Sequence, residues 1–343
     1  MHSQKWKVLY ELNLVQGDEP KNELRSPWYM KFLMALFAVA AMGLLLYLLG
    51  DLLKTSYMSG LILGLFLLLF SYAIYLVDKS GIWEHLATAL ALSGEVLVVI
   101  AFDSMLKLEP WVLYLFVASI QFVLLLLMPN FILKVISATI FSVAMFELFS
   151  SMGYFYVYII LLAFTTLELW LNEFTFPKKI SIVRASSYGA FFSLVYLNIV
   201  TFDTGNSSKQ QLESLEFAQQ LGWIDLSYTF MLFYLIWRLT KGMATLNLKF
   251  MALISLVLFV VGFLSYTTHG ITLGLLLIIL SYAVYNKIIM TFGIMLLAIP
   301  IFHYYYMFGT TLMDKAKLLL LIGVVIFMAR WIFLKTTKGL VNA

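Results

Sequence analysis

The chain contains little charge and no cysteine. Of its 343 residues, 12% are Asp, Glu, Lys or Arg, and none is Cys. An ordinary soluble domain carries about 25% charged residues, so that class of fold is excluded. Without Cys the chain cannot form a disulfide, a thiolate metal site or a cysteine nucleophile.

The sequence also lacks the signatures of nucleotide and metal chemistry. Its four histidines, His2, His85, His269 and His303, are not spaced as HxxxH or HExxH, and no GxxxxGK[ST] phosphate loop occurs. We therefore expect no metal, no cofactor and no enzymatic activity. The first 28 residues are mixed and polar, which predicts no cleavable signal peptide.

Long apolar runs dominate the chain: 63% of the residues are hydrophobic and the mean hydropathy is +0.96. A membrane-spanning helix needs about 20 apolar residues, and short polar, Gly or Pro breaks separate the runs. The predicted fold class is all-α, a polytopic transmembrane bundle of about twelve spans with antiparallel neighbours. The predicted spans are 29–50, 57–77, 83–102, 110–129, 131–150, 154–172, 180–201, 223–240, 246–266, 270–286, 288–307 and 316–334.

The basic residues predict the orientation of these spans, because Lys and Arg gather in cytoplasmic loops. With the N-terminus inside, 17 of the 22 Lys and Arg residues fall on the inner side. Both termini are therefore predicted to be cytoplasmic. The net charge of +4 then needs no nucleic-acid partner.

The same topology divides the chain into three segments, the second of which contains an outer-side loop. Residues 1–28 form a cytoplasmic N-terminal segment, either a mobile tail or an amphipathic helix on the inner leaflet. The bundle covers 29–334, and residues 335–343 form a cytoplasmic tail. An outer-side loop at 203–222 is predicted to begin with a turn at 203–208 and to continue as an interfacial helix.

Two segments of the chain resemble each other. Residues 60–75 and 270–285 are identical at nine of sixteen positions, including a Ser-Tyr-Ala-x-Tyr run. The spacings Gly60-x3-Gly64 and Gly270-x3-Gly274 predict closely packed helices at matched positions. Spans 1–3 are thus predicted to be duplicated in spans 9–11 as a parallel repeat.

A short motif near the C-terminus carries a family resemblance. The run from Tyr304 to Lys315 resembles the YYYxLxxTLLxK signature of an uncharacterised GDYXXLXXT-type bacterial membrane-protein family, and residues 26–29 resemble its opening. His303 and Tyr304 stand where that family's name has Gly-Asp. The resemblance implies a polytopic protein of the bacterial cytoplasmic (inner) membrane and supplies no activity.

Few ionisable residues lie inside the predicted spans, and these are the candidate transport or binding residues. Glu95 lies deepest, about 16 Å from the start of its helix, and is either functional or a structural hydrogen-bonding group. His303 is either functional or a satisfied interface histidine. Glu147 and Glu168 lie near helix ends, where the preferred interpretation is contact with the headgroup region.

The repeat brings two of these candidates into relation. With an offset of 208, Glu95 aligns with His303; with the ungapped offset of 210, it aligns with Tyr305. In either alignment, a polar residue of span 11 would occupy the position equivalent to that of an acid in span 3. Tyr305 also lies where an aromatic belt is expected.

Three functions remain open from the sequence. The first is a transporter- or channel-like protein for a small solute or ion, with Glu95 and His303 handling a proton. The second is a structural or assembly protein, with membrane lipids and unidentified membrane proteins as partners. The third is a membrane-embedded enzyme acting on lipid or glycan precursors, for which the sequence offers no catalytic cluster.

Overall fold

The computed structural model describes residues 57–77, 83–207, 211–241 and 270–307, with isolated positions between 37 and 48, at 262 and between 313 and 327. These ranges contain helices and no strand. Contacts divide the chain into two units, Met1–Leu106 and Lys107–Ala343. Predicted spans 29–50, 246–266 and 316–334 lie outside the continuously described residues.

The first unit contains a pair of packed helices, α3 (Tyr57–Val77) and α4 (Glu84–Leu106). The two backbones approach at Gly64 and Gly94: a Cβ atom on Gly64 would lie 2.8 Å from the Gly94 carbonyl oxygen. The Ser71 hydroxyl donates across the pair to the Ala87 carbonyl at 2.6 Å. Small residues therefore set the distance between α3 and α4.

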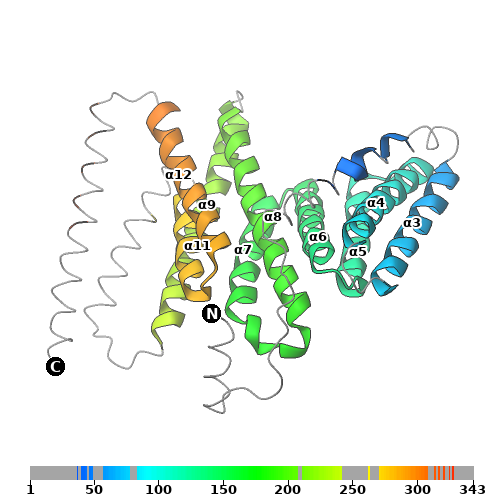
Figure 1. The fold of residues 1–343 in the computed structure, drawn as a ribbon. Helices are drawn as coiled ribbons and strands as arrows, with labels where there is room; N and C mark the ends of the chain where they lie inside the picture. The colour runs from blue at the N-terminus through cyan, green and yellow to red at the C-terminus, as the bar shows by residue number, and fades with distance from the viewer. Residues whose placement is uncertain are drawn as a thin grey trace, which may run out of the picture. The chain divides into compact units, whose positions relative to one another are not determined.

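The second unit contains the remaining described helices: α5 (Pro110–Leu127), α6 (Phe131–Ser151), α7 (Phe155–Leu171), α8 (Ile180–Ser207), α9 (Gln211–Thr240), α11 (Ile271–Val284) and α12 (Lys287–Met307). Short 3-10 turns, η1 (Glu173–Thr175) and η2 (Pro177–Lys179), join α7 to α8. Helix α6 packs on α5 and α8, α7 packs on α8 and α9, and α11 packs on α9 and α12. Figure 1 shows α9, α11 and α12 side by side.

Local sequence explains several of these helix starts. Pro110 occupies the first turn of α5, where its fixed φ suits a helix and its missing N–H is not needed. The Asn130 side chain caps α6 by accepting hydrogen bonds from the Ile132 and Leu133 amides at 2.6 and 3.2 Å. Asn286 likewise accepts from the Ile288 amide at 3.0 Å at the start of α12.

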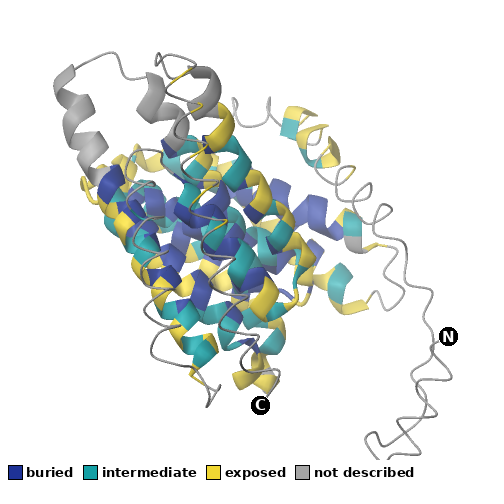
Figure 2. Ribbon diagram, turned by 90° about the vertical axis from the view of Figure 1, so that its left-hand side faces the viewer, coloured by how far each residue is buried: buried dark blue, intermediate teal, exposed yellow. Residues whose placement is uncertain are grey.

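The outer surfaces of the helices are apolar, which indicates that they face a membrane interior. Buried residues gather where helices lie against one another, and exposed residues lie on the outer sides of the helices (Figure 2). Many of the exposed residues are large and apolar: Leu69 is 70% exposed and Phe230 is 67% exposed. Five helices among the described residues are long and apolar enough to cross a membrane: Tyr57–Val77, His85–Leu106, Pro110–Leu127, Phe131–Ser151 and Ile180–Thr201. The chain is an all-helical integral membrane protein.

The segment around residue 203 differs from the predicted turn and loop. Helix α8 continues to Ser207 and α9 begins at Gln211, so the predicted interfacial helix is the first part of α9. Proline is absent between 203 and 222, and Leu, Glu and Gln favour helix. The Asp-Thr-Gly-Asn run was therefore too weak a break to end α8 at residue 201.

Candidate functional site

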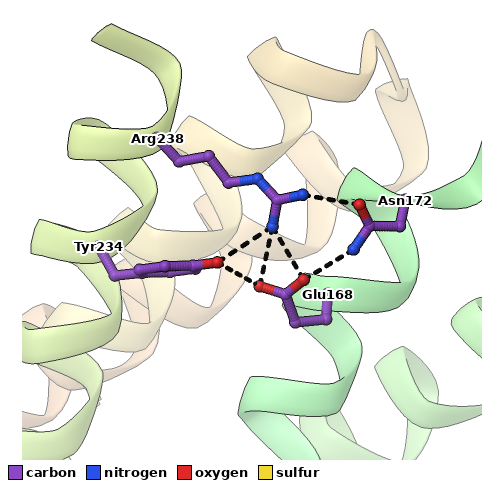
Figure 3. A network of polar contacts seen from close by, with 4 residues as sticks. All are labelled: Glu168, Asn172, Tyr234 and Arg238. Atoms are coloured by element: carbon purple, nitrogen blue, oxygen red, sulfur yellow. Dashed lines mark hydrogen bonds and ion pairs between the residues drawn. The ribbon is translucent and has the colours of Figure 1, made fainter. Parts of the chain in front are cut away.

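Three groups of polar side chains lie within the second unit, and the first surrounds Glu168. Arg238 donates from Nη1 to both Glu168 carboxylate oxygens at 2.9 and 2.8 Å, and from Nη2 to the Asn172 side-chain oxygen at 2.6 Å. Tyr234 donates to Glu168 at 2.7 Å, and so does the Asn172 amide. We call these four residues the Glu168 cluster; Figure 3 shows their side chains converging on the carboxylate.

The Glu168 cluster joins the last turn of α7 to the last turns of α9. The two charged side chains remain partly exposed, Arg238 at 31% and Glu168 at 26%. The carboxylate accepts from three different residues, so its position is determined by the packing of α7 on α9. This arrangement fixes a charge in place and suits a structural role for Glu168.

The second group lines a cavity at the same end of α7. The cavity has a volume of about 380 Å³ and lies between η1, the start of α8 and the turn from α11 to α12. We call it the Lys287 pocket. Its polar and aromatic lining residues include Trp170, Glu173, Arg184, Tyr188, Asn286 and Lys287.

Fixed contacts hold the walls of the Lys287 pocket. Arg184 forms an ion pair with Glu173, which is 3% exposed. Tyr188 packs edge-on against Trp170 with ring centroids 4.8 Å apart, and its hydroxyl accepts from Asn286 at 2.9 Å. The pocket is therefore an open depression whose lining residues come from α7, η1, α8, α11 and α12.

The third group lies around Asp225 of α9, which is 2% exposed. Its carboxylate accepts from the Gly270 amide at 3.4 Å and from the Thr272 hydroxyl at 3.3 Å, both at the start of α11. Asn198 of α8 donates to the Tyr228 hydroxyl at 3.1 Å. We call these five residues the Asp225 cluster.

A glycine and a proline shape the start of α11 beside Asp225. Gly270 adopts φ of 91°, a conformation that glycine reaches without strain. A Cβ atom there would lie 3.1 Å from the Pro300 ring and 3.6 Å from the Asn198 side-chain oxygen. Pro300, inside α12, and Asn198 therefore lie close to Gly270, and a side chain there would need the positive φ and a small shift of the Pro300 ring.

The remaining sequence candidates lie in separate places. Glu95 is 3% exposed in α4 of the first unit, and Glu147 is half-buried in α6. His303 and Tyr305 belong to α12, but their side chains lie outside the described residues. The contact between Glu95 and His303 stays a prediction, because α4 and α12 belong to different units.

The glycines of the predicted repeat lie in close helix contacts. Gly60 and Gly64 are buried in α3, and Gly274 is buried in α11. A Cβ atom on Gly274 would lie 2.8 Å from both the backbone nitrogen and the Cβ atom of Leu297 in α12. Gly270 performs a different task at the start of α11.

Sequence reasoning missed Asp225 and the partners of Glu168. Asp225 is the third residue of the predicted span 223–240 and was not among the candidates. The sequence signal that could have found Asp225 was an acid inside a predicted span together with a glycine, Gly270, at the start of another. Among the described residues, no group of three His, Cys, Asp or Glu side chains could hold a metal ion.

Comparison with known proteins gives a family without an assigned activity. The fold and its polar clusters define a helical integral membrane protein. The chain belongs to the family described as domain of unknown function (DUF4401), whose model matches residues 27–336. This confirms the predicted membership of an uncharacterised family. Neither the curated proteins nor the solved structures contain a match.

Proposed function

We propose that the protein is a transporter- or channel-like permease for a small solute or ion, built from about twelve spans and linked to proton movement. The observation that carries this proposal is the Asp225 cluster, where a buried acid meets the start of a short helix inside the bundle. Intramembrane acids mark solute and proton pathways. Helix starts inside the bilayer are characteristic of transporter binding sites.

The depth of Asp225 supports this proposal. Asp225 precedes the end of α9 by fifteen residues, and Pro300 follows the start of α12 by thirteen, so both lie about 20 Å from the inner end of the bundle. The hydrocarbon core is about 30 Å thick. Helix α11, with 14 residues, is about 21 Å long and begins within that depth.

The chemistry of the cluster suits reversible binding. The N-terminus of α11 favours negative charge through its dipole and free amides. Asp225, Thr272 and Asn198 add a carboxylate, a hydroxyl and an amide from three helices. A proton or a small cation that binds Asp225 would weaken its contact with α11, which couples occupancy to helix position.

The predicted parallel repeat also supports transport. The four buried residues of α3, Gly60, Gly64, Leu67 and Ser71, align at the offset of 210 with Gly270, Gly274, Leu277 and Ser281, which are all buried. Helix α3 packs on α4 as α11 packs on α12. Within this proposal Glu95 and His303 remain candidates for a proton-sharing pair.

The proposed orientation places both termini in the cytoplasm of a bacterial inner membrane. Because the chain lacks Cys, a single cysteine introduced at Ser80 or at Ser208 shows on which side of the membrane that residue lies. A membrane-impermeant maleimide added outside intact cells should label the Ser208→Cys variant and leave Ser80→Cys unlabelled. Labelling of both variants from one side would contradict the topology.

Flux through reconstituted protein tests the transport proposal. Liposomes with an internal pH-sensitive dye would receive an imposed potassium diffusion potential, with and without a panel of small external solutes. Wild-type protein should accelerate acidification, and Asp225→Asn should slow it by about tenfold. The control is Glu109→Gln, an exposed acid that makes no capping hydrogen bond at the start of α5.

The same experiment distinguishes transport from the alternative. Proton movement no faster than in protein-free liposomes, under every solute tested, would contradict transport and favour a structural or assembly protein. Equal rates for wild type and Asp225→Asn would remove Asp225 from the mechanism. We propose no catalysis for this chain.

A further inference from the structure

The Lys287 pocket lies apart from the Asp225 cluster, at the opposite end of α11, and transport as proposed above does not use it. Two cationic side chains line it, Arg184 from α8 and Lys287 from α12, together with one acid, Glu173. The acid is already paired with Arg184. The pocket therefore has an excess of positive charge in an open depression of about 380 Å³.

Its donors remain available to a ligand. Arg184 contacts Glu173 through Nε, and in the described part of the chain its two terminal nitrogens have no hydrogen-bond partner. The Lys287 ammonium likewise has none among the described residues. The Tyr188 hydroxyl accepts from Asn286 and can still donate its own proton.

The start of α12 strengthens the attraction for an anion. Asn286, Lys287 and Ile288 all line the pocket. The Ile288 amide is capped by the Asn286 side chain, and the dipole of α12 still favours negative charge beside its N-terminus. A guanidinium, an ammonium and a helix start arranged around one cavity match the several oxygens of a phosphate group. A planar carboxylate has only two oxygens for the donors of α8 and α12.

Apolar side chains complete the rim of the pocket. Phe174 is 75% exposed, Tyr285 is 94% exposed and Ile288 is 45% exposed, and all three line the opening. The proposed topology places this end of the bundle in the cytoplasmic leaflet. The rim would therefore meet the region where lipid headgroups join their acyl chains.

We propose that the Lys287 pocket binds a phosphate ester anion, with Arg184 and Lys287 holding the phosphate and the start of α12 beside it. Membrane lipids and soluble metabolites both carry this chemistry. The apolar rim favours a phospholipid headgroup. The site works independently of proton movement at Asp225.

Three probes separate these sources in titration calorimetry of the full-length, delipidated protein in detergent. Dioctanoyl phosphatidic acid carries both the phosphate and acyl chains, glycerol 3-phosphate carries the phosphate alone, and dioctanoylglycerol carries the chains alone. Phosphatidic acid that binds about tenfold more tightly than glycerol 3-phosphate identifies a lipid site. Equal affinities for these two identify a soluble phosphate ester.

Two variants test the assigned residues. Lys287→Gln should weaken phosphatidic acid binding by about tenfold, because it removes a charge-assisted contact. Glu173→Gln combined with Arg184→Gln should weaken it similarly while leaving no buried carboxylate unpaired. The charge-matched control is Lys179→Gln, which lies in η2 outside the pocket lining and should bind as wild type does.

Several results would overturn the phosphate site. These are no phosphatidic acid binding by wild type, dioctanoylglycerol binding as tightly as phosphatidic acid, or wild-type affinity in Lys287→Gln. Equal losses of phosphatidic acid affinity in Lys179→Gln and Lys287→Gln would show that binding depends on the general surface charge and not on the pocket. A melting temperature within about 2 °C of wild type confirms that each variant is folded.

Discussion

Helix α9 takes part in two contacts that involve an acid, one at its middle and one near its C-terminal end, and the two contacts differ in kind. At the middle, Asp225 is 2% exposed and accepts hydrogen bonds from the start of α11. Nine residues later, Tyr234 contacts Glu168, whose carboxylate is 26% exposed and ion-paired with Arg238. The two acids are thus held at levels about 14 Å apart along the helix.

The charge of Glu168 is fixed by its ion pair, whereas the charge of Asp225 can change when a proton or a cation binds. Glu168 lies where water or headgroups can reach it, and Arg238 neutralises it through two hydrogen bonds. Asp225 instead bonds to backbone and hydroxyl groups of a helix that begins at its side. A change of charge at Asp225 therefore acts on α11, whereas Glu168 mainly joins α7 to α9.

The largest expected effect comes from removing the Asp225 carboxylate. Asp225→Ala should lower the free energy of unfolding by about 2–4 kcal/mol, because the Gly270 amide and the Thr272 hydroxyl lose a buried acceptor. Asp225→Asn keeps one oxygen acceptor and should lose about 1 kcal/mol. Unfolding in SDS, followed by circular dichroism, measures both.

The ratio of the stability losses of Asp225→Ala and Asp225→Asn tests whether neutral hydrogen bonds hold the Asp225 carboxylate. A small effect of Asp225→Ala would show that the carboxylate does not hold the start of α11. Equal losses for Asn and Ala would show that the negative charge, and not the hydrogen-bond acceptor, matters at this position.

The sequence explains why helix positions were predictable while these contacts were not. Apolar runs and their breaks locate segments such as 57–77 and 131–150, which coincide with α3 and α6 to within one residue, because each helix depends on its own composition. The pairing of Glu168 with Arg238 joins residues 70 positions apart. No local pattern contains that information.

Antiparallel alternation did limit the possibilities. Glu168 and Arg238 each lie near the end of a predicted span that runs toward the inner side, so they were expected at one level of the membrane. Their lateral proximity depends on α7 packing against α9, which the apolar sequences do not specify. Asp225 was overlooked for a related reason, because the local sequence does not show that the start of α11 lies beside it.

The second effect in size concerns the fixed pair. Arg238→Gln should lower the free energy of unfolding by about 1–2 kcal/mol, between the values for exposed and buried pairs, because both side chains remain partly exposed. The double variant Glu168→Gln with Arg238→Gln should recover most of that loss. A double-mutant cycle in SDS unfolding measures the coupling.

The outcome distinguishes a structural pair from a functional one. If the double variant is stable and still moves protons in liposomes, the Glu168 cluster is structural, in contrast to Asp225. Loss of flux with stability restored would place Glu168 in the pathway and remove the difference between the two contacts of α9.

The smallest effect comes from the two tyrosines of α9, which differ in the same way as their acids. Tyr228 is fully buried and accepts from Asn198, so Tyr228→Phe should lower the free energy of unfolding by about 1 kcal/mol through an unpaired amide donor. Tyr234→Phe removes one of several donors to Glu168, and Arg238 and Asn172 keep the carboxylate in place, so we expect a loss of about 0.5 kcal/mol. SDS unfolding of both variants, with wild type measured in parallel, resolves the order. A larger loss for Tyr234→Phe would mean that the Glu168 cluster depends on the neutral Tyr234 donor as much as on Arg238. Glu168 would then be held by neutral hydrogen bonds, as Asp225 is, and the difference between the two acids would disappear.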